Sequence, residues 1–155
     1  MSRVESRLSE LNLTLPSPAA AAGNYLPAKA AGDLLYLSGA LPFVNGELTM
    51  RGKVGGDVTI EQGQAAARTC TLNLLAAIKA SAGSLDRVAQ VVSIRGYVNC
   101  GPDFTEQPAV INGASDLLVQ IFGDNGRHAR AAVGVSSLPK SAAVEIEMVV
   151  QLKPG

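Results

Sequence analysis

The sequence predicts an α+β fold in which two main helices cover one face of a mostly antiparallel sheet. Two long segments carry apolar residues at helical spacing, and several shorter segments alternate apolar and polar residues as half-buried strands do. Strands precede, separate and follow the two helices, an order that favours helices packed on one side of a sheet. The other sheet face is then left to a partner or to a ligand site. A chain of 155 residues fits one domain, so we expect a single domain over residues 1–155.

The N-terminal region predicts a short amphipathic helix followed by a connector. Residues 2–11 place Val4, Leu8 and Leu11 at helical spacing behind a serine cap. Residues 12–23 are rich in proline and alanine, and they predict an extended arm on the surface. Helix and arm together occupy about residues 1–23.

Short strands are expected next. Residues 24–30 and 34–38 predict two strands joined by a turn at Gly32. Residues 43–48 predict a hairpin with Asn45 and Gly46 at its tip, and a glycine-rich loop follows it.

The two main helices have clear start and stop signals. Thr59, with a glutamine three residues later, forms a capping box for a helix that ends at Gly83. Residues 88–98 are the longest strand candidate. Pro108 suits the first turn of the second helix, which is expected to end at Gly123.

Residues 128–149 alternate apolar and polar side chains on both sides of a Leu-Pro-Lys-Ser break and predict a two-stranded hairpin. Period two places Arg130, and likewise Glu145 and Glu147, on faces that the aliphatic core does not use. An arginine and two carboxylates on an otherwise apolar hairpin indicate a small-molecule site.

The register of this hairpin constrains the site. With the turn centred near residues 139 and 140, Arg130 pairs near Val149 and Glu145 lies opposite Gly134. Four residues along a strand span roughly 13 Å. Arg130 and Glu145 of one chain are then too far apart for one small ligand, so any cooperation between them requires a subunit interface.

Composition excludes several classes of protein. Basic and acidic residues number 13 each and are scattered, which argues against nucleic acid. No apolar run approaches the ~18 residues of a membrane span, and no signal pattern opens the chain. Cys70 and Cys100 fit reduced thiols in a cytoplasmic protein, and the single histidine, His128, excludes a multi-histidine metal site. The glycine-rich segment 52–56 lacks P-loop spacing, so we expect neither cofactor nor metal.

Arg130 and Glu145 are the candidate catalytic residues. A guanidinium on a strand suits bidentate binding of a carboxylate. The alternative is a solvated arginine on an edge strand that binds nothing. The small residues beside Arg130 favour the ligand-binding interpretation. A partly desolvated Glu145 can activate water; the alternative is an ion pair across strands or subunits. Glu147 shares its face and receives a structural role by default.

Weaker candidates lie elsewhere in the chain. The Tyr25 hydroxyl can bind a ligand, but most such tyrosines only pack. Ser38 and Gly39 offer a hydroxyl and an amide to an anion, or simply end a strand. His128 is a titrating candidate, although a lone histidine at a strand start is more often structural.

The chain resembles the YjgF/RidA family, also labelled endoribonuclease L-PSP-like, over residues 20–152. The resemblance rests on Leu-Tyr-Leu-Ser-Gly at 35–39, Asp-Phe at 103–104, Val-Ile-Asn at 110–112, Ala-Arg at 129–130, Leu-Pro-Lys at 138–140 and Val-Glu-Ile-Glu at 144–147. The N-terminal helix and the segment 107–118 are similar to those of the longer branch of the family.

The resemblance implies a chorismate-mutase-like fold and a homotrimer with a barrel-like core and inter-subunit clefts. It implies hydrolysis of 2-imino acids to 2-oxo acids and ammonia without cofactor or metal. By residue matching, Arg130 would bind the substrate carboxylate and Glu145 would position the attacking water. Tyr25 and Asn112 would line the cleft, with Ser38 and Gly39 nearby.

The sequence departs from the family pattern around the arginine. Ala131 and Ala132 replace a hydroxyl residue and a cysteine, Ala40 replaces a glutamine, and His128 replaces a proline. Ala132 is therefore a substrate-binding position without its thiol, and the pocket is more apolar than usual.

Three hypotheses of function follow. The leading one is a cytoplasmic imine deaminase in which Arg130, Glu145 and Tyr25 act on a small carboxylate-bearing metabolite. The second is a non-catalytic trimer that binds a small carboxylate, which the missing side chains beside Arg130 favour. The third, an endoribonuclease, follows only from the family label, and the absence of basic patches weighs against it.

Overall fold

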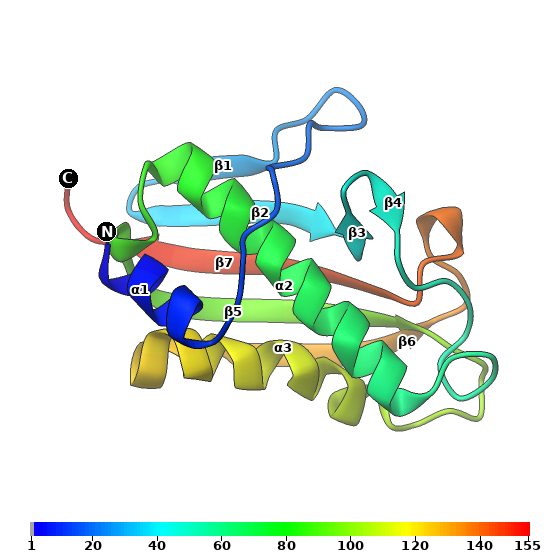
Figure 1. Cartoon of the computed structure of the whole chain (residues 1–155). Helices are drawn as coiled ribbons and strands as arrows, with labels where there is room; N and C mark the ends of the chain where they lie inside the picture. The colour runs from blue at the N-terminus through cyan, green and yellow to red at the C-terminus, as the bar shows by residue number, and fades with distance from the viewer. Residues whose placement is uncertain (1) are drawn as a thin grey trace.

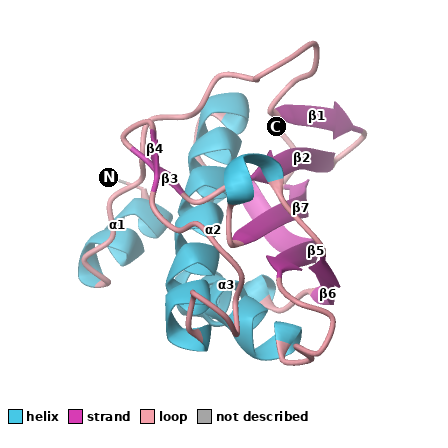
Figure 2. Ribbon diagram, turned by 90° about the vertical axis from the view of Figure 1, so that its right-hand side faces the viewer, coloured by secondary structure: helices cyan, strands magenta, loops and turns pink. Residues whose placement is uncertain are grey.

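The protein forms two layers, a five-stranded sheet and a layer of helices, in a computed structural model that describes residues 2–155 (Figures 1 and 2). The strands of the sheet are β1 (Ala28–Ala31), β2 (Leu34–Ala40), β5 (Val88–Asn99), β6 (Ala129–Val135) and β7 (Val144–Leu152). Their order is β1-β2-β7-β5-β6, and every pair is antiparallel except the parallel pair β5–β6. The predicted α+β class and mostly antiparallel sheet are confirmed.

Two long helices cover one face of the sheet, as predicted. Helix α2 (Ile60–Ala82) begins at the capping box of Thr59, and α3 (Gln107–Phe122) has proline in its first turn. Their apolar stripes and the alternate residues Val144, Ile146, Met148 and Val150 of β7 are buried in one core. Figure 2 shows both helices on the same side of the sheet, and among residues 2–155 no helix covers the other side.

Shorter elements complete the chain. The predicted hairpin is present as β3 (Phe43–Val44) and β4 (Glu47–Leu48), with Asn45 and Gly46 at positive φ as a two-residue turn requires. Three 3₁₀ turns are η1 (Leu85–Arg87), η2 (Gly123–Gly126) and η3 (Pro139–Ser141). Strand β1 begins at Ala28 and not at residue 24 because the amide of Tyr25 is turned back to the carbonyl of Gly23 and Pro27 has no amide hydrogen.

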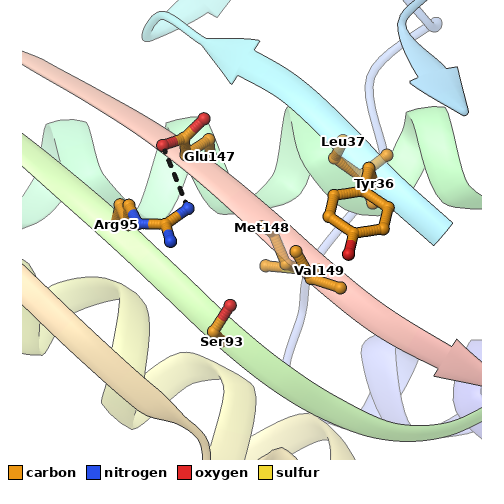
Figure 3. Close-up of a pocket in the computed structure, with 7 residues that line it drawn as sticks. All are labelled: Tyr36, Leu37, Ser93, Arg95, Glu147, Met148 and Val149. Atoms are coloured by element: carbon orange, nitrogen blue, oxygen red, sulfur yellow. Dashed lines mark ion pairs between the residues drawn. The ribbon is translucent and has the colours of Figure 1, made fainter. Parts of the chain in front are cut away.

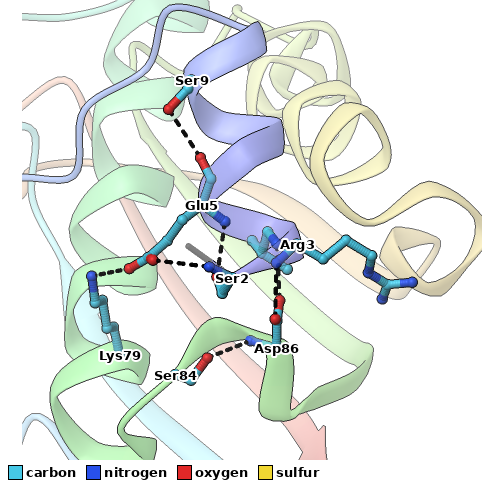
Figure 4. A network of polar contacts seen from close by, with 8 residues as sticks. Ser2, Arg3, Glu5, Ser9, Lys79, Ser84 and Asp86 are labelled. Carbon is cyan, nitrogen blue, oxygen red and sulfur yellow. Dashed lines mark hydrogen bonds and ion pairs between the residues drawn. The ribbon is translucent and has the colours of Figure 1, made fainter.

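The N-terminal helix is capped and held at its first turn. Helix α1 (Arg3–Glu10) begins at Ser2, whose hydroxyl accepts from the Glu5 amide in the capping box. The Asp86 carboxylate accepts from the amides of Arg3 and Val4 at 2.9 Å each, and these bonds hold the pKa of Asp86 below its ordinary value (Figure 4). The predicted arm follows α1 without helix or strand until β1.

The predicted pairing of the last two strands is wrong. Strands β6 and β7 lie where the alternation placed them, but β5 lies between them and pairs with both. Segment 136–143 crosses the end of β5, fastened by bonds from Gly52 to the Ser141 carbonyl and from Ala143 to the Met50 carbonyl. Arg130 therefore aligns with Ile94 and not with Val149 across a turn.

Candidate functional site

Arg130 lies on the helix-covered face of the edge strand β6, contrary to the prediction that it lies away from the core. Across the sheet, Arg130 aligns with Ile94 of β5, which aligns with Met148 of β7, and both of these side chains are buried against the helices. The guanidinium reaches α3, where Nη1 donates to Asn112 Oδ1 at 2.8 Å and to Ser115 Oγ at 3.0 Å, and Nη2 donates to the Pro108 carbonyl at 3.3 Å. The structure thus brings together Arg130 and Asn112, two of the predicted site residues.

Two N–H groups of Arg130 stay available for a ligand. Of the five guanidinium donors, both on Nη1 and one on Nη2 are taken by α3. Among residues 2–155, no carboxylate forms an ion pair with Arg130. The Nε donor and the second Nη2 donor lie on neighbouring nitrogens, an arrangement that a carboxylate accepts through two parallel bonds.

Ser115 was missed in the sequence, although its spacing carries a signal. It follows Asn112 by three residues, one helical turn, so both side chains face Arg130 from the same side of α3. We define the arginine cluster as Asn112, Ser115, His128 and Arg130.

A pocket of about 370 Å³ opens along β6 beyond the arginine cluster. Cys100, Phe104, Gln107 and Gly134 line it, with Lys53. Glycine at position 134 leaves room for these side chains, because an added Cβ would lie 2.7 Å from Cys100 Sγ and 2.8 Å from Gln107 Nε2, and both would have to shift. Ala132, between Arg130 and Gly134, is half-buried and packs against the core.

Glu145 lies on the uncovered face of β7, over the backbone of β2. A Cβ at Gly39 would come within 2.5 Å of Glu145 Oε1, so only glycine allows the carboxylate to lie there. Partial burial, and secondly the charge of Glu147, raise the pKa of Glu145 above its ordinary value. Among residues 2–155, no cation pairs with this carboxylate.

Ser38 links the Tyr25 segment to the glutamate. Its hydroxyl donates to the Leu26 carbonyl at 2.6 Å, and its amide donates to the Pro27 carbonyl at 2.9 Å. Tyr25 follows the exposed arm and is itself 52% exposed, with its hydroxyl accepting from the Ala22 amide at 3.3 Å. We define the glutamate cluster as Tyr25, Ser38, Gly39 and Glu145.

Glu147 has structural partners, in keeping with its predicted role. The Tyr97 hydroxyl donates to Glu147 Oε1 at 2.6 Å, a bond that raises the pKa of Tyr97. Arg95 Nη1 lies 3.6 Å from the same oxygen. Figure 3 shows the Arg95–Glu147 pair at one side and Tyr36 at the other side of a small pocket, which is lined by none of the predicted site residues.

The arginine cluster and the glutamate cluster are separate within one chain. Glu145 aligns with Tyr97 of β5, and Arg130 aligns with Ile94 of the same strand. These positions are three residues apart along β5, which separates Glu145 from Arg130 by roughly 10 Å in the strand direction. Two inter-strand spacings add roughly 10 Å across the sheet, and the side chains point to opposite faces. The predicted register was wrong, but its conclusion stands: one chain cannot place both groups on one small ligand.

A metal-binding cluster and a membrane-spanning helix are both absent from residues 2–155. Over residues 2–155, no group of three or more histidine, cysteine, aspartate or glutamate side chains could hold a metal ion. No helix in that range is long and apolar enough to cross a membrane.

The fold and these clusters define an α+β protein with one helix-covered sheet face and two polar half-sites. The model of the YjgF/chorismate mutase-like family, described as "putative endoribonuclease", matches residues 5–152, and the chain belongs to this family. The chain is 46% identical over 151 residues to protein TCP17 of Trypanosoma cruzi, covering 97% of this chain and 94% of that one.

Two further relatives carry more specific descriptions. A crystal structure described as a putative endoribonuclease from Shewanella oneidensis has a TM-score of 0.94 and 38% identity, and covers 97% of this chain and all of its own. The 2-iminobutanoate/2-iminopropanoate deaminase of Dermatophagoides farinae is 29% identical over 131 residues, covering 84% of this chain and 88% of that one. The predicted family and its chorismate-mutase-like fold are confirmed.

Proposed function

We propose that the chain hydrolyses 2-imino acids to 2-oxo acids and ammonia in clefts between subunits of a cytoplasmic homotrimer. The observation that carries this proposal is the Arg130 guanidinium, which α3 holds through three bonds and which keeps two neighbouring N–H donors for a carboxylate. The deaminase named among the relatives supports the reaction. The separation of Arg130 from Glu145 supports a cleft completed by a second subunit.

The reaction requires only binding, a base and water. Arg130 binds the carboxylate of the imino acid, and Glu145 of an adjacent subunit accepts a proton from water as the water oxygen bonds to the imine carbon. That proton passes to nitrogen and gives a carbinolamine. Glu145 then transfers the hydroxyl proton to the same nitrogen as the carbon–oxygen double bond forms, the carbon–nitrogen bond breaks, and ammonia leaves a 2-oxo acid. No metal or cofactor takes part in this scheme. A raised pKa of Glu145 makes the carboxylate a stronger base.

Substitution of Arg130 tests the proposal. With imino acid generated by an amino-acid oxidase, Arg130→Ala is expected to lower kcat/KM by about a hundredfold or more, because the carboxylate loses two charge-assisted bonds. Arg130→Lys keeps the charge without the planar pair of donors and is expected to recover only part of the loss.

Arg127→Ala is the matched control. Arg127 is three residues away and largely exposed in its pair with Asp124, so its loss should leave the rate unchanged. An Arg130→Ala protein with the rate of the unmodified protein contradicts the mechanism.

A non-catalytic carboxylate binder is the second candidate. The alanines at 131 and 132 favour it, because the strand that carries Arg130 then offers no hydroxyl or thiol at these two positions. It predicts thermal stabilisation by 2-oxobutanoate or benzoate that depends on Arg130, with no imine turnover. The ribonuclease named in the family description has less support, since 13 basic and 13 acidic residues are scattered along the chain.

A further inference from the structure

A chain of hydrogen bonds extends from Arg130 into the protein through Ser115 and His128. Ser115 Oγ lies 3.0 Å from Arg130 Nη1 and 2.9 Å from His128 Nε2. On the far side of the ring, His128 Nδ1 lies 2.6 Å from the Gly126 carbonyl oxygen. Helix α3, turn η2 and strand β6 each contribute a member.

The direction of each bond follows from the chemistry of the groups. A carbonyl oxygen only accepts, so Nδ1 of His128 carries a hydrogen and donates to Gly126. A guanidinium only donates, so Ser115 Oγ accepts from Arg130. The Ser115 hydroxyl hydrogen is then free to be donated to Nε2, which is an acceptor in the neutral Nδ1–H ring. With His128 neutral, each of these groups therefore has a hydrogen-bond partner within the chain of bonds.

Protonation of His128 would disrupt this arrangement. A hydrogen on Nε2 would reverse this bond: Ser115 Oγ would accept from both His128 and Arg130, and the serine hydroxyl hydrogen would lose Nε2 as its acceptor. The pKa of His128 is lowered, first by burial and further by the charge of Arg130, against the opposing effect of the Gly126 carbonyl. Two charged residues that precede His128 in the chain, Asp124 and Arg127, pair with each other in solvent. A third charged residue, Asp116, follows Ser115 on α3.

We propose that Ser115 and His128 are positioning residues for Arg130. A neutral His128 fixes the Ser115 hydroxyl, and Ser115 with Asn112 fixes Nη1, so that the two free N–H groups keep one orientation toward the ligand. This inference rests on the proposed carboxylate-binding role of Arg130. It assigns a function to the histidine, which the proposed reaction does not use.

The decisive variants differ by one hydroxyl. Ser115→Val and Ser115→Thr place side chains of equal shape at the site, and only threonine can accept from Arg130 and donate to His128. With 2-oxobutanoate as the probe, Ser115→Val is expected to raise Kd about 5–10-fold, the effect of one lost hydrogen bond. Ser115→Thr is expected to stay within about twofold. In imine hydrolysis, valine should raise KM by a similar factor with little change in kcat.

The single histidine gives a direct spectroscopic check without ligand. In the NMR spectrum of the whole protein, the one imidazole is expected as the Nδ1–H tautomer. Arg130→Gln should raise its pKa, because a neighbouring positive charge is removed. The Nε–H resonance of Arg130 should report a rigid guanidinium in the threonine variant and a mobile guanidinium in the valine variant.

The outcomes separate this inference from the proposed function. Equal Kd values and equal Arg130 signals for the valine and threonine variants, or an Nε2–H tautomer, would overturn the positioning role. If no imine is hydrolysed but the Arg130 signal still separates the two variants, the deaminase proposal fails and the positioning role stands.

Discussion

At the residue scale, the surroundings of Glu145 suit the role of a base that we propose for it. It is partly buried, lies against the bare backbone of Gly39, and has a second carboxylate two residues away. Burial and the like charge both favour the protonated form, so its pKa is raised. A base with a raised pKa binds a proton more strongly and stays charged only above that pKa.

The pH dependence of hydrolysis tests this reading of Glu145. The active form is the carboxylate, so kcat/KM should fall as pH falls through the raised pKa of Glu145. Glu147→Gln removes the like charge, lowers the pKa of Glu145, and should move this acidic limb to lower pH. Glu145→Gln should remove most of the rate at every pH. An acidic limb that does not move in Glu147→Gln would exclude Glu147 as a cause of the shift.

From the sequence alone, candidate site residues could be named, but the sheet face to which each side chain points could not be predicted. Arg130, Glu145 and Asn112 could be selected from residue type and motif. That Arg130 faces α3 could not, because period two fixes which residues share a face but not which face a helix covers. Ser115 lies one helical turn after Asn112, but its contact with Arg130 depends on the position of α3 beside β6, which the sequence does not reveal.

At the element scale, the sequence predicts where the two main helices begin and end. It does not predict which strands pair with each other. Capping residues such as Thr59 and the glycine after Ala82 act locally, so the sequence contains the whole signal. Alternation in β6 and β7 is equally local, but it does not name the partner strand. The crossing at 136–143 depends on bonds to segment 50–52, which is distant in sequence.

The closest contact between α2 and α3 offers a test at this scale. A Cβ at Gly113 would lie 2.4 Å from the Gln64 carbonyl oxygen, so Gly113→Ala must separate the helices. We expect a loss of about 1–3 kcal/mol in unfolding free energy, measured by denaturant titration. Because α3 also holds Arg130, the Kd for 2-oxobutanoate should rise.

Gly101→Ala is the matched control, since no atom lies within 4 Å of its added Cβ and its φ is not positive. Equal stability of the Gly113→Ala and Gly101→Ala proteins would show that the two helices move apart without cost.

At the scale of the whole molecule, the uncovered sheet face is the surface that fits a subunit contact. Tyr36 and Val133, 48% and 45% exposed, lie on it together with the Arg95–Glu147 pair. A trimer that buries this face would explain why these two apolar side chains are exposed in the single chain. It would also bring the glutamate cluster of one subunit toward the arginine cluster of another.

Mixed trimers test this shared site. Arg130→Ala and Glu145→Gln chains should each be inactive alone. When they are unfolded together in equal amounts and reassembled, roughly one quarter of the clefts receive both native residues, and activity should return to about that fraction. A mixture that stays inactive after assembly into trimers would place Arg130 and Glu145 of each cleft in one chain.

The opposite placement of the two clusters has a consequence for how such proteins diverge. In the proposed reaction, recognition of the acid group and activation of water are assigned to different strands, and no side chain of one cluster contacts the other within a chain. Substitutions beside Arg130, such as the alanines at 131 and 132, can therefore change ligand preference while the geometry around Glu145 is inherited unaltered. Within one chain, the fold thus keeps the strand proposed to bind the carboxylate apart from the strand proposed to activate water, so the two can change independently.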